Sequence, residues 1–296
     1  MTTDVRRPGG PGFLGGRVVS RIGYGAMQLA RLRDDRAAAV TLLRRALDLG
    51  VDHLDTAQVY GNGYVNGLLR AAIDPADHAV VSTKVGIAAN PGGKQPMRPA
   101  QRPAELRVGV EDNLRSLGAE QIAVVNLRRM DVGAGFPLPR DQVVDLEDQL
   151  AVLMALRDAG KIGAIGLSGV DFDGLRRAIP AGITCVQNSY SVLTRDHEDM
   201  LKLSEAEGIA WVPYYPLGGA TPGVPKVTDD PVVRDTARAL NVSTAQVGLA
   251  WLLRHSPNTL LIPGTSDAGH LAANVAAGDI LLDDATLAAL DAVAPA

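Results

Sequence analysis

The sequence has little cysteine, few aromatic residues and no long apolar run. Its 296 residues contain a single cysteine, Cys185, which excludes an internal disulfide and a metal cluster built from several cysteines. Aromatic residues make up only 4% of the chain, which argues against an aromatic-lined steroid pocket. No apolar run reaches the roughly 18 residues needed to cross a bilayer, and the Gly/Pro-rich segment 1–16 lacks the apolar core of a secretory signal. We therefore expect a soluble cytoplasmic protein.

The chain also lacks an excess of positive charge. Its 29 basic and 33 acidic side chains leave a net charge of −4, so no broad cationic field is available for a nucleic acid. Its five histidines show no H-x-x-x-H spacing, and we expect no metal site. Hydrophobic residues at 46% and charged residues at 21% are typical of an ordinary folded protein.

Short apolar segments alternate with amphipathic ones from about residue 20 to the end of the chain. The segments with a strand pattern are 21–25, 53–56, 79–84, 122–127, 164–168, 184–187, 210–214 and 260–263. The segments with a helical pattern are 34–49, 63–73, 103–117, 141–159, 171–178, 195–207, 231–255 and 267–277. Eight strands that are each followed by a helix predict an α/β fold, a closed (β/α)8 TIM barrel. No linker interrupts the alternation, so we expect one domain over residues 1–296.

The two ends of the chain predict small additions to the barrel. Residues 17–19 favour a β-hairpin that closes the barrel bottom, and 283–294 favour an additional C-terminal helix. Gly10, Gly12 and Gly15 match the dinucleotide pattern G-x-G-x-x-G, but no strand precedes them and no helix follows. We interpret the match as accidental and expect 1–16 to be a flexible arm.

Three polar residues fall at or just beyond the ends of neighbouring predicted strands. Asp55 ends the second strand, Tyr60 follows it five residues later, and Lys84 ends the third strand. A free phenol, with a pKa near 10, is a poor acid at neutral pH, but a buried ammonium beside it stabilises the phenolate. A carboxylate would keep that ammonium charged and oriented, so the three residues could protonate a carbonyl oxygen. The alternative is a structural ion pair of Asp55 with Lys84 beside an unrelated loop tyrosine.

With these residues in place, the sequence resembles the aldo-keto reductase superfamily over about residues 17–282. The matching stretches are Ile22-Gly23-Tyr24-Gly25-Ala26-Met27, Leu54-Asp55-Thr56-Ala57 with Tyr60-Gly61, Thr83-Lys84, Leu114-Arg115-Ser116-Leu117-Gly118, Ile165-Gly166-Leu167-Ser168, Gln187-Asn188-Ser189-Tyr190-Ser191, Pro216-Leu217-Gly218 and Ile262-Pro263-Gly264-Thr265. The resemblance implies a barrel that binds NADPH, with NADH as the alternative, in an extended form without a Rossmann domain. It also implies hydride transfer to a small carbonyl substrate.

The resemblance carries three catalytic residues over to Asp55, Tyr60 and Lys84, but the fourth departs from the family. Where the family has a histidine at the end of the fourth strand, this sequence has Arg128. A guanidinium stays charged and only donates hydrogen bonds, so Arg128 could polarise a carbonyl or hold an anionic substituent but could not shuttle a proton. The alternative is that Arg128 forms a salt bridge with a loop carboxylate such as Asp131.

The resemblance also implies a set of cofactor contacts. The residues expected at the nicotinamide and its ribose are Gly25, Ala26, Met27, Asp55, Ser168, Gln187 and Tyr214, the last stacked on the ring. Gly169 replaces a family asparagine, so one carboxamide contact is either lost or supplied by Asn188. The residues expected at the phosphates and adenosine are Leu217, Gly219, Gly264, Thr265, Ser266, His270 and Asn274. Gly264 and His270 stand where many members have a lysine and an arginine for the 2′-phosphate.

A closer resemblance, to a bacterial branch that includes pyridoxal reductases, rests on two stretches, 65–70 and 125–131. It makes pyridoxal the first candidate substrate. The alternatives are a ketone or enone intermediate of a biosynthetic pathway, and a low-turnover regulatory protein that binds a nicotinamide cofactor. The sequence leaves the oligomeric state open.

Overall fold

The computed structural model describes residues 7–132, 138–219 and 224–295. Its centre is a seven-stranded parallel sheet with the spatial order β11-β10-β9-β8-β5-β4-β3. The strands are β3 (Tyr24–Gly25), β4 (His53–Asp55), β5 (Val80–Val85), β8 (Ile122–Arg128), β9 (Ile162–Ser168), β10 (Ile183–Gln187) and β11 (Ala210–Trp211). Each coincides with a predicted strand, although β11 ends three residues early.

The eighth predicted strand closes the ring between the two edges of this sheet. Thr259 forms a parallel bridge with Trp211 at one edge, and Leu261 forms a parallel bridge with Ile22 at the other. The Leu260 amide donates to the Trp211 carbonyl at 2.8 Å, and the Leu261 amide donates to the Arg21 carbonyl at 2.8 Å. The predicted (β/α)8 barrel is therefore confirmed, with its eighth strand held by isolated bridges.

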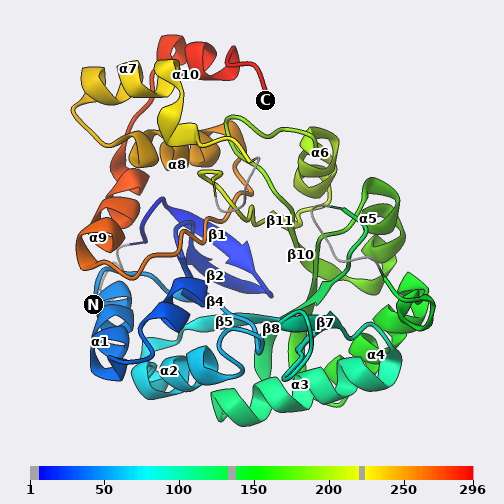
Figure 1. Cartoon of the computed structure of the whole chain (residues 1–296). Helices are drawn as coiled ribbons and strands as arrows, with labels where there is room; N and C mark the ends of the chain where they lie inside the picture. Colours follow the sequence, from blue (N-terminus) through cyan, green and yellow to red (C-terminus); the bar gives the residue numbers. More distant parts are fainter. Residues whose placement is uncertain (1–6, 133–137, 220–223, 296) are drawn as a thin grey trace, which may run out of the picture.

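Helices surround the ring of strands on its outer side (Figure 1). They are α1 (Arg36–Asp48), α2 (Tyr64–Ala72), α3 (Pro103–Leu117), α4 (Leu146–Asp158), α5 (Phe172–Ala178), α6 (Glu198–Ala206), α7 (Pro231–Leu240), α8 (Thr244–His255), α9 (Ala268–Ala276) and α10 (Asp284–Asp291). The expected additional helix near the C-terminus is confirmed as α10. A 3-10 helix, η1 (Ala26–Arg31), follows β3. A short antiparallel pair, β6 (Ile87–Ala89) with β7 (Met97–Pro99), lies in the loop after β5.

One predicted helix, 231–255, is two helices in the structure. Asn241 ends α7 in the left-handed conformation at φ 53°, a position that asparagine tolerates. Ser243 then begins α8 with a capping box, in which its side chain accepts from the Gln246 amide. The continuous apolar periodicity concealed this break, because each of the two helices buries an apolar face.

The prediction of a flexible arm over residues 1–16 is wrong for residues 11–16. Strand β1 (Pro11–Leu14) pairs antiparallel with β2 (Arg17–Ser20), and the glycines at 15 and 16 form the turn with positive φ. Leu14 and Val19 are buried against the interior side chains Val80 and Val124. The predicted hairpin therefore exists and closes one end of the barrel, where Figure 1 shows it across the ring.

The barrel interior changes from apolar to polar along its axis. Since side chains alternate between the two faces of a strand, every second residue points inward. Next to the hairpin these residues are apolar, as at Val80 and Val124. One step further along β4 and β5 they are His53 and Ser82, and at the strand ends they are Asp55 and Lys84. The polar groups thus converge at the carboxyl ends of the strands, where barrel enzymes have their active sites.

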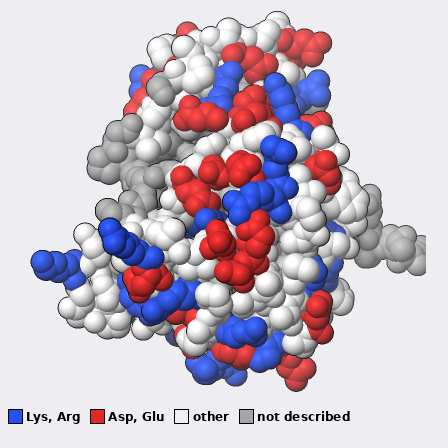
Figure 2. Space-filling view, turned by 90° about the vertical axis from the view of Figure 1, so that its right-hand side faces the viewer, with Lys and Arg blue, Asp and Glu red and all other residues white. Residues whose placement is uncertain are grey.

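The surface shows no single-sign charge on the face seen in Figure 2, where acidic and basic side chains are interspersed. Such a mixed surface fits the small net charge of −4. No helix in the described parts of the chain has the length and apolarity required for a membrane span.

Candidate active site

Asp55 and Lys84 form a buried ion pair at the ends of β4 and β5. The Lys84 ammonium donates to Asp55 Oδ1 and, at 3.0 Å, to the carbonyl of Thr56. The other carboxylate oxygen, Asp55 Oδ2, accepts from Ser82 Oγ at 3.0 Å and from Gln187 Nε2 at 2.8 Å. The side chains of Asp55 and Lys84 are 4% and 9% exposed, so water screens their charges little.

This environment favours a charged lysine. Burial is the largest influence on Lys84 and by itself lowers its pKa, but the charge of Asp55, the nearby Tyr60 and the hydrogen bond to Asp55 together raise the pKa above its ordinary value. The positive charge of Arg128 opposes the rise. Lys84 is therefore a fixed cation at the end of the barrel at neutral pH.

Tyr60 lies directly beside this cation. The Lys84 Nζ atom is 5.3 Å from the centroid of the Tyr60 ring. Tyr60 is half-buried in the turn between β4 and α2, which the Tyr60 amide closes by donating to the Ala57 carbonyl at 2.9 Å. Its hydroxyl has no hydrogen bond to any of the residues described, so it is available to a bound molecule. The structure therefore brings together the three residues that sequence reasoning placed at one site.

Arg128 ends β8 on the inward face and is half-buried. Its guanidinium forms no ion pair or hydrogen bond with a residue in the described ranges, whereas Asp131 pairs with Arg129 at 2.7 Å. The alternative in which Asp131 neutralises Arg128 is therefore wrong. The charge of Arg128 is felt instead by Lys84 and by Tyr214, whose pKa burial raises and Arg128 lowers.

Gln187 ends β10 with one unused acceptor. Its Nε2 atom donates to Asp55, but its Oε1 atom is buried and has no hydrogen-bond partner among the described residues. An unpaired buried acceptor costs free energy unless a bound group satisfies it. A ligand amide would satisfy it, and the carboxamide of a nicotinamide ring is such a donor. The residues present at this position therefore fit the cofactor that the resemblance implies.

Of the two alternatives for the contact missing at Gly169, its supply by Asn188 is wrong. Asn188 Oδ1 accepts from the Val170 amide at 3.2 Å, and its Nδ2 atom donates to the Val170 carbonyl at 2.8 Å. The Nδ2 atom also donates to Met200 Sδ at 3.5 Å, so both N–H bonds of the amide are used within the protein and none is free for a carboxamide. Gly169 has φ 65°, and an added Cβ there would lie 2.7 Å from the Arg129 carbonyl oxygen. This crowding explains why the position holds glycine, while Ser168 is buried at the end of β9.

Other expected cofactor residues lie at the same end of the barrel. Gly25 lies at the end of β3, where an added Cβ would be 2.4 Å from the Ile262 carbonyl oxygen. Ala26 is buried at the start of η1, and Met27, beside it, is 43% exposed. Tyr214 is half-buried and packs edge-on against Tyr215, with ring centroids 5.2 Å apart. Leu217 and Gly219 follow in the next loop, Gly219 with φ 68°.

The segment after the eighth strand leads into α9. Gly264 and Ser266 are exposed, Thr265 is buried, and Thr265 Oγ1 accepts from the Asp267 amide at 3.0 Å. Asp267 caps α9, accepting from the His270 amide at 2.7 Å. The His270 side chain is 80% exposed. The Asp267 carboxylate therefore already accepts from one of the free amides at this helix start.

Asn274 points from α9 into the core and is 9% exposed. The structure places it one turn after His270 on the same helix, as the sequence indicated. No hydrogen bond to the Asn274 side chain is made within the described residues. Its expected contact with adenine stays a prediction.

Comparison with known proteins agrees with this geometry. The model of the aldo/keto reductase family matches residues 21–295. The chain belongs to the aldo/keto reductase family. It is 42% identical to a pyridoxine 4-dehydrogenase of Escherichia coli (strain K12), covering 95% of this chain and 96% of that protein. It is 34% identical to an uncharacterized oxidoreductase of Schizosaccharomyces pombe, covering 94% and 88% of the two chains.

A solved structure of an aldo/keto reductase from Klebsiella pneumoniae, in complex with NADP and acetate, shares the fold. Its TM-score is 0.76 at 25% identity, and the match covers 93% of this chain and 92% of the other. Another aldo-keto reductase from the same organism, in complex with NADPH, has a TM-score of 0.77 at 25% identity, with 93% and 91% covered. This chain is thus an oxidoreductase of a family with a TIM-barrel fold.

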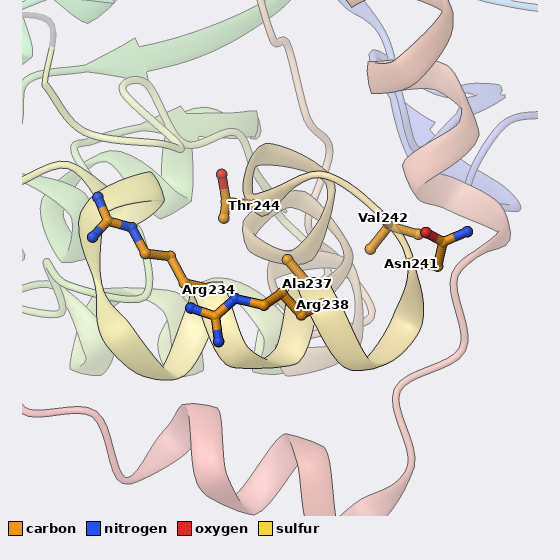
Figure 3. Close-up of a pocket in the computed structure, with 6 residues that line it drawn as sticks. All are labelled: Arg234, Ala237, Arg238, Asn241, Val242 and Thr244. Atoms are coloured by element: carbon orange, nitrogen blue, oxygen red, sulfur yellow. The ribbon is translucent and has the colours of Figure 1, made fainter.

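A separate surface pocket of about 370 Å³ lies on α7 and the turn before α8 (Figure 3). Its lining includes Arg234 and Arg238, which pair with Asp229 and Asp235. None of the residues expected at the cofactor or the substrate lines it. It is therefore separate from the site at the strand ends.

Sequence reasoning missed some of the buried polar residues that surround Asp55, Tyr60 and Lys84. Gln187 was expected at the cofactor, but its bond to Asp55 was not expected. Asn66 and Asn113 are fully buried on the barrel-facing sides of α2 and α3. The available signal was an asparagine within an otherwise apolar helix face, since a buried amide needs a full set of partners.

Proposed function

We propose that this protein reduces an aldehyde or ketone to an alcohol with NADPH, and that pyridoxal, with pyridoxine as product, is its substrate. The observation that carries the proposal is the buried Asp55–Lys84 pair, whose ammonium lies against Tyr60 while the Tyr60 hydroxyl stays free. Family membership supports the reaction class, and the 42% identity to a pyridoxine 4-dehydrogenase supports the substrate.

The cofactor in this proposal is NADP(H), which the similar Klebsiella structures hold. When bound, it supplies the hydride that reaches the carbonyl carbon. Gln187 Oε1 would accept from the nicotinamide carboxamide, and Tyr214 would cover one face of the ring. Gly25, Ala26 and Met27 would border the site, with Ser168 opposite. Leu217, Gly219, Gly264, Thr265, Ser266, His270 and Asn274 would hold the phosphates and adenosine.

The chain's own residues then manage the proton. Tyr60 binds the carbonyl oxygen of the substrate through its hydroxyl and donates its proton as negative charge develops on that oxygen. Lys84 stabilises the resulting phenolate, because its charge is held close to the ring. Asp55 keeps Lys84 protonated and oriented, and Ser82 and Gln187 keep Asp55 in place. The structure contains each of these interactions between side chains; only the contact of Tyr60 with the substrate is proposed.

Arg128 gives the site a second cation with no counter-charge in the described residues. A phenolic oxygen on an aromatic aldehyde such as pyridoxal would meet that charge, and a guanidinium can donate two hydrogen bonds to it. A neutral aldehyde would gain nothing comparable. We therefore assign Arg128 to substrate binding and not to proton transfer.

Arg128→Met tests this assignment by removing the charge but keeping bulk. The variant should raise the KM for pyridoxal by roughly tenfold or more, the value of one charge-assisted hydrogen bond, while the KM for benzaldehyde changes less than about twofold. Both are measured by the loss of NADPH absorbance. Arg115→Met, which removes an exposed arginine paired with Asp112 on α3, is the matched control.

Two results would contradict the proposal at different levels. Equal losses for pyridoxal and benzaldehyde in Arg128→Met would remove Arg128 from substrate choice. No turnover by the unmodified protein of any carbonyl in an aldehyde and ketone panel, despite tight NADPH binding, would contradict the reductase function and favour a regulatory binding protein.

A further inference from the structure

A buried hydrogen-bond network lies between the strand ends that carry Asp55 and Lys84 and the helices α2 and α3, on the outer side of the barrel. Its centre is Asn66 on α2, fully buried, whose Oδ1 atom accepts from Thr56 Oγ1 at 2.8 Å. Its Nδ2 atom has three acceptors: Gln58 Oε1 at 3.1 Å, Asn113 Oδ1 at 2.9 Å and Ser116 Oγ at 2.9 Å. The whole amide is therefore used within the protein.

The network reaches the immediate neighbour of each strand-end residue. Thr56 follows Asp55, and Thr83 precedes Lys84 and donates through Oγ1 to Asn113 Oδ1 at 2.6 Å. Because side chains alternate along a strand, the two threonines point out of the barrel while Asp55 and Lys84 point in. The Thr56 carbonyl also accepts from Lys84 Nζ at 3.0 Å.

A third branch reaches the turn that carries Tyr60. Gln58, two residues before Tyr60, accepts through Oε1 from Asn66 and, at 2.7 Å, from Ser116 Oγ. Its carbonyl accepts from the Gly63 amide at 2.7 Å, which closes the turn. The turn is thus joined to α2 and α3 and not only to its own backbone.

We propose that Asn66, with Asn113, is the positioning group that fixes Asp55, Lys84 and Tyr60 relative to one another. The Asn66 amide connects Thr56 at the end of β4, Asn113 (which binds Thr83 of β5) and Gln58 in the turn after β4. A shift of any one of these elements would therefore break hydrogen bonds to the others. Buried, fully satisfied polar networks hold a single geometry, because each broken bond leaves an unpaired group. The proposal rests on the proposed function, since it concerns the rate of that reaction.

The direct test removes two hydroxyls from the network and leaves the site untouched. The double variant Thr56→Val, Thr83→Val keeps side-chain shape but loses both bonds to the asparagines. We expect its kcat for aldehyde reduction to fall about tenfold, since displacements of about 1 Å can cost up to a hundredfold. The KM and the Kd for NADPH should stay within twofold, and the pH profile of kcat should shift.

A matched set of variants separates this role from general stability. Thr56→Ser, Thr83→Ser keeps the hydroxyls and loses only methyl groups, so it should retain most of the kcat. Asn66→Ala should lose at least as much kcat as the valine pair. Asn258→Ala removes an amide that bonds the Ile209 carbonyl at 2.7 Å, beside the residues that bridge to Trp211. It should lower Tm without changing kcat.

The rate of amide hydrogen exchange, measured without substrate, is a second test of the positioning role that does not depend on turnover. Amides of residues 57–63 should exchange faster in the valine pair than in the serine pair or the unmodified protein. Unchanged kcat and unchanged exchange in the valine pair would overturn the positioning role, as would equal losses in the serine pair. Absence of turnover in the unmodified protein would instead contradict the proposed function, and the exchange result would still decide the role of Asn66.

Discussion

At the scale of single residues, the interior of the barrel contains a histidine with an unusual environment. His53 lies two residues before Asp55 on the inward face of β4, and it is 1% exposed. Neither ring nitrogen is hydrogen-bonded to a side chain of the residues that the structure describes. Burial lowers the pKa of His53 to about 4, although the charges of Asp52 and Asp55 oppose this shift. The residue is therefore neutral in the folded protein at neutral pH.

This histidine predicts how stability depends on pH. Between about pH 6.5 and pH 4 an unfolded histidine binds a proton while folded His53 does not, so the unfolded state gains protons and stability falls as the pH falls through this window. The loss should reach roughly 3 kcal/mol. Urea unfolding of the unmodified protein and of His53→Gln at pH 7, 5.5 and 4.5 measures it. The variant should lose less stability on acidification, and equal losses in both proteins would contradict this account.

At the scale of elements, the C-terminal helix α10 is attached by an arginine and a tryptophan. Arg195 donates to the carbonyls of Asp291 at 2.8 Å and Leu290 at 2.9 Å, at the end of that helix. Its guanidinium lies 4.9 Å from the centroid of the Trp251 ring, and Trp251 Nε1 donates to Asp291 Oδ1 at 2.8 Å. Cations near the last carbonyls of a helix are favourable.

Substitution of the two arginines that contact α10 should lower the free energy of unfolding by different amounts. Arg195→Met should lower the free energy of unfolding by about 1–3 kcal/mol, because it breaks two charge-assisted bonds, of which the one to Leu290 is partly buried. Arg254→Met should change it by less than about 0.5 kcal/mol, because Arg254 is an exposed residue 3.9 Å from Asp284. Urea unfolding of both variants measures this, with aldehyde reduction unchanged. Equal midpoints for the two variants would show that α10 is not held by Arg195.

At the scale of the whole molecule, alternation of apolar segments was enough to predict a closed barrel. The strand pattern found every strand of the ring, because parallel strands covered on both faces are short and continuously apolar. The break at Asn241 and the first strand of the hairpin, Pro11–Leu14, were not predicted, since the first lies inside unbroken helical periodicity and the second consists of glycine-rich sequence typical of loops. Both depend on turn geometry, which an apolar pattern does not reveal.

In the candidate site, the principal residues were predictable from the sequence, but many of their contacts were not. Asp55, Tyr60 and Lys84 were identifiable because strand ends in a barrel meet at one edge. The bonds of Asp55 to Ser82 and Gln187, the use of Asn188 by backbone groups and the network of Asn66 were not identifiable. Each of these requires knowing which side chains from distant segments lie within 3.2 Å, and residue spacing along the chain does not give that distance.

The central claim is that Tyr60 donates the proton to the substrate and is not required to hold the cofactor. The most direct measurement compares Tyr60→Phe with the unmodified protein in NADPH-dependent aldehyde reduction and, separately, in NADPH binding by fluorescence. We expect kcat to fall at least about a hundredfold, the usual contribution of general acid catalysis, with the Kd for NADPH within twofold. Retained kcat with intact cofactor binding would contradict the claim.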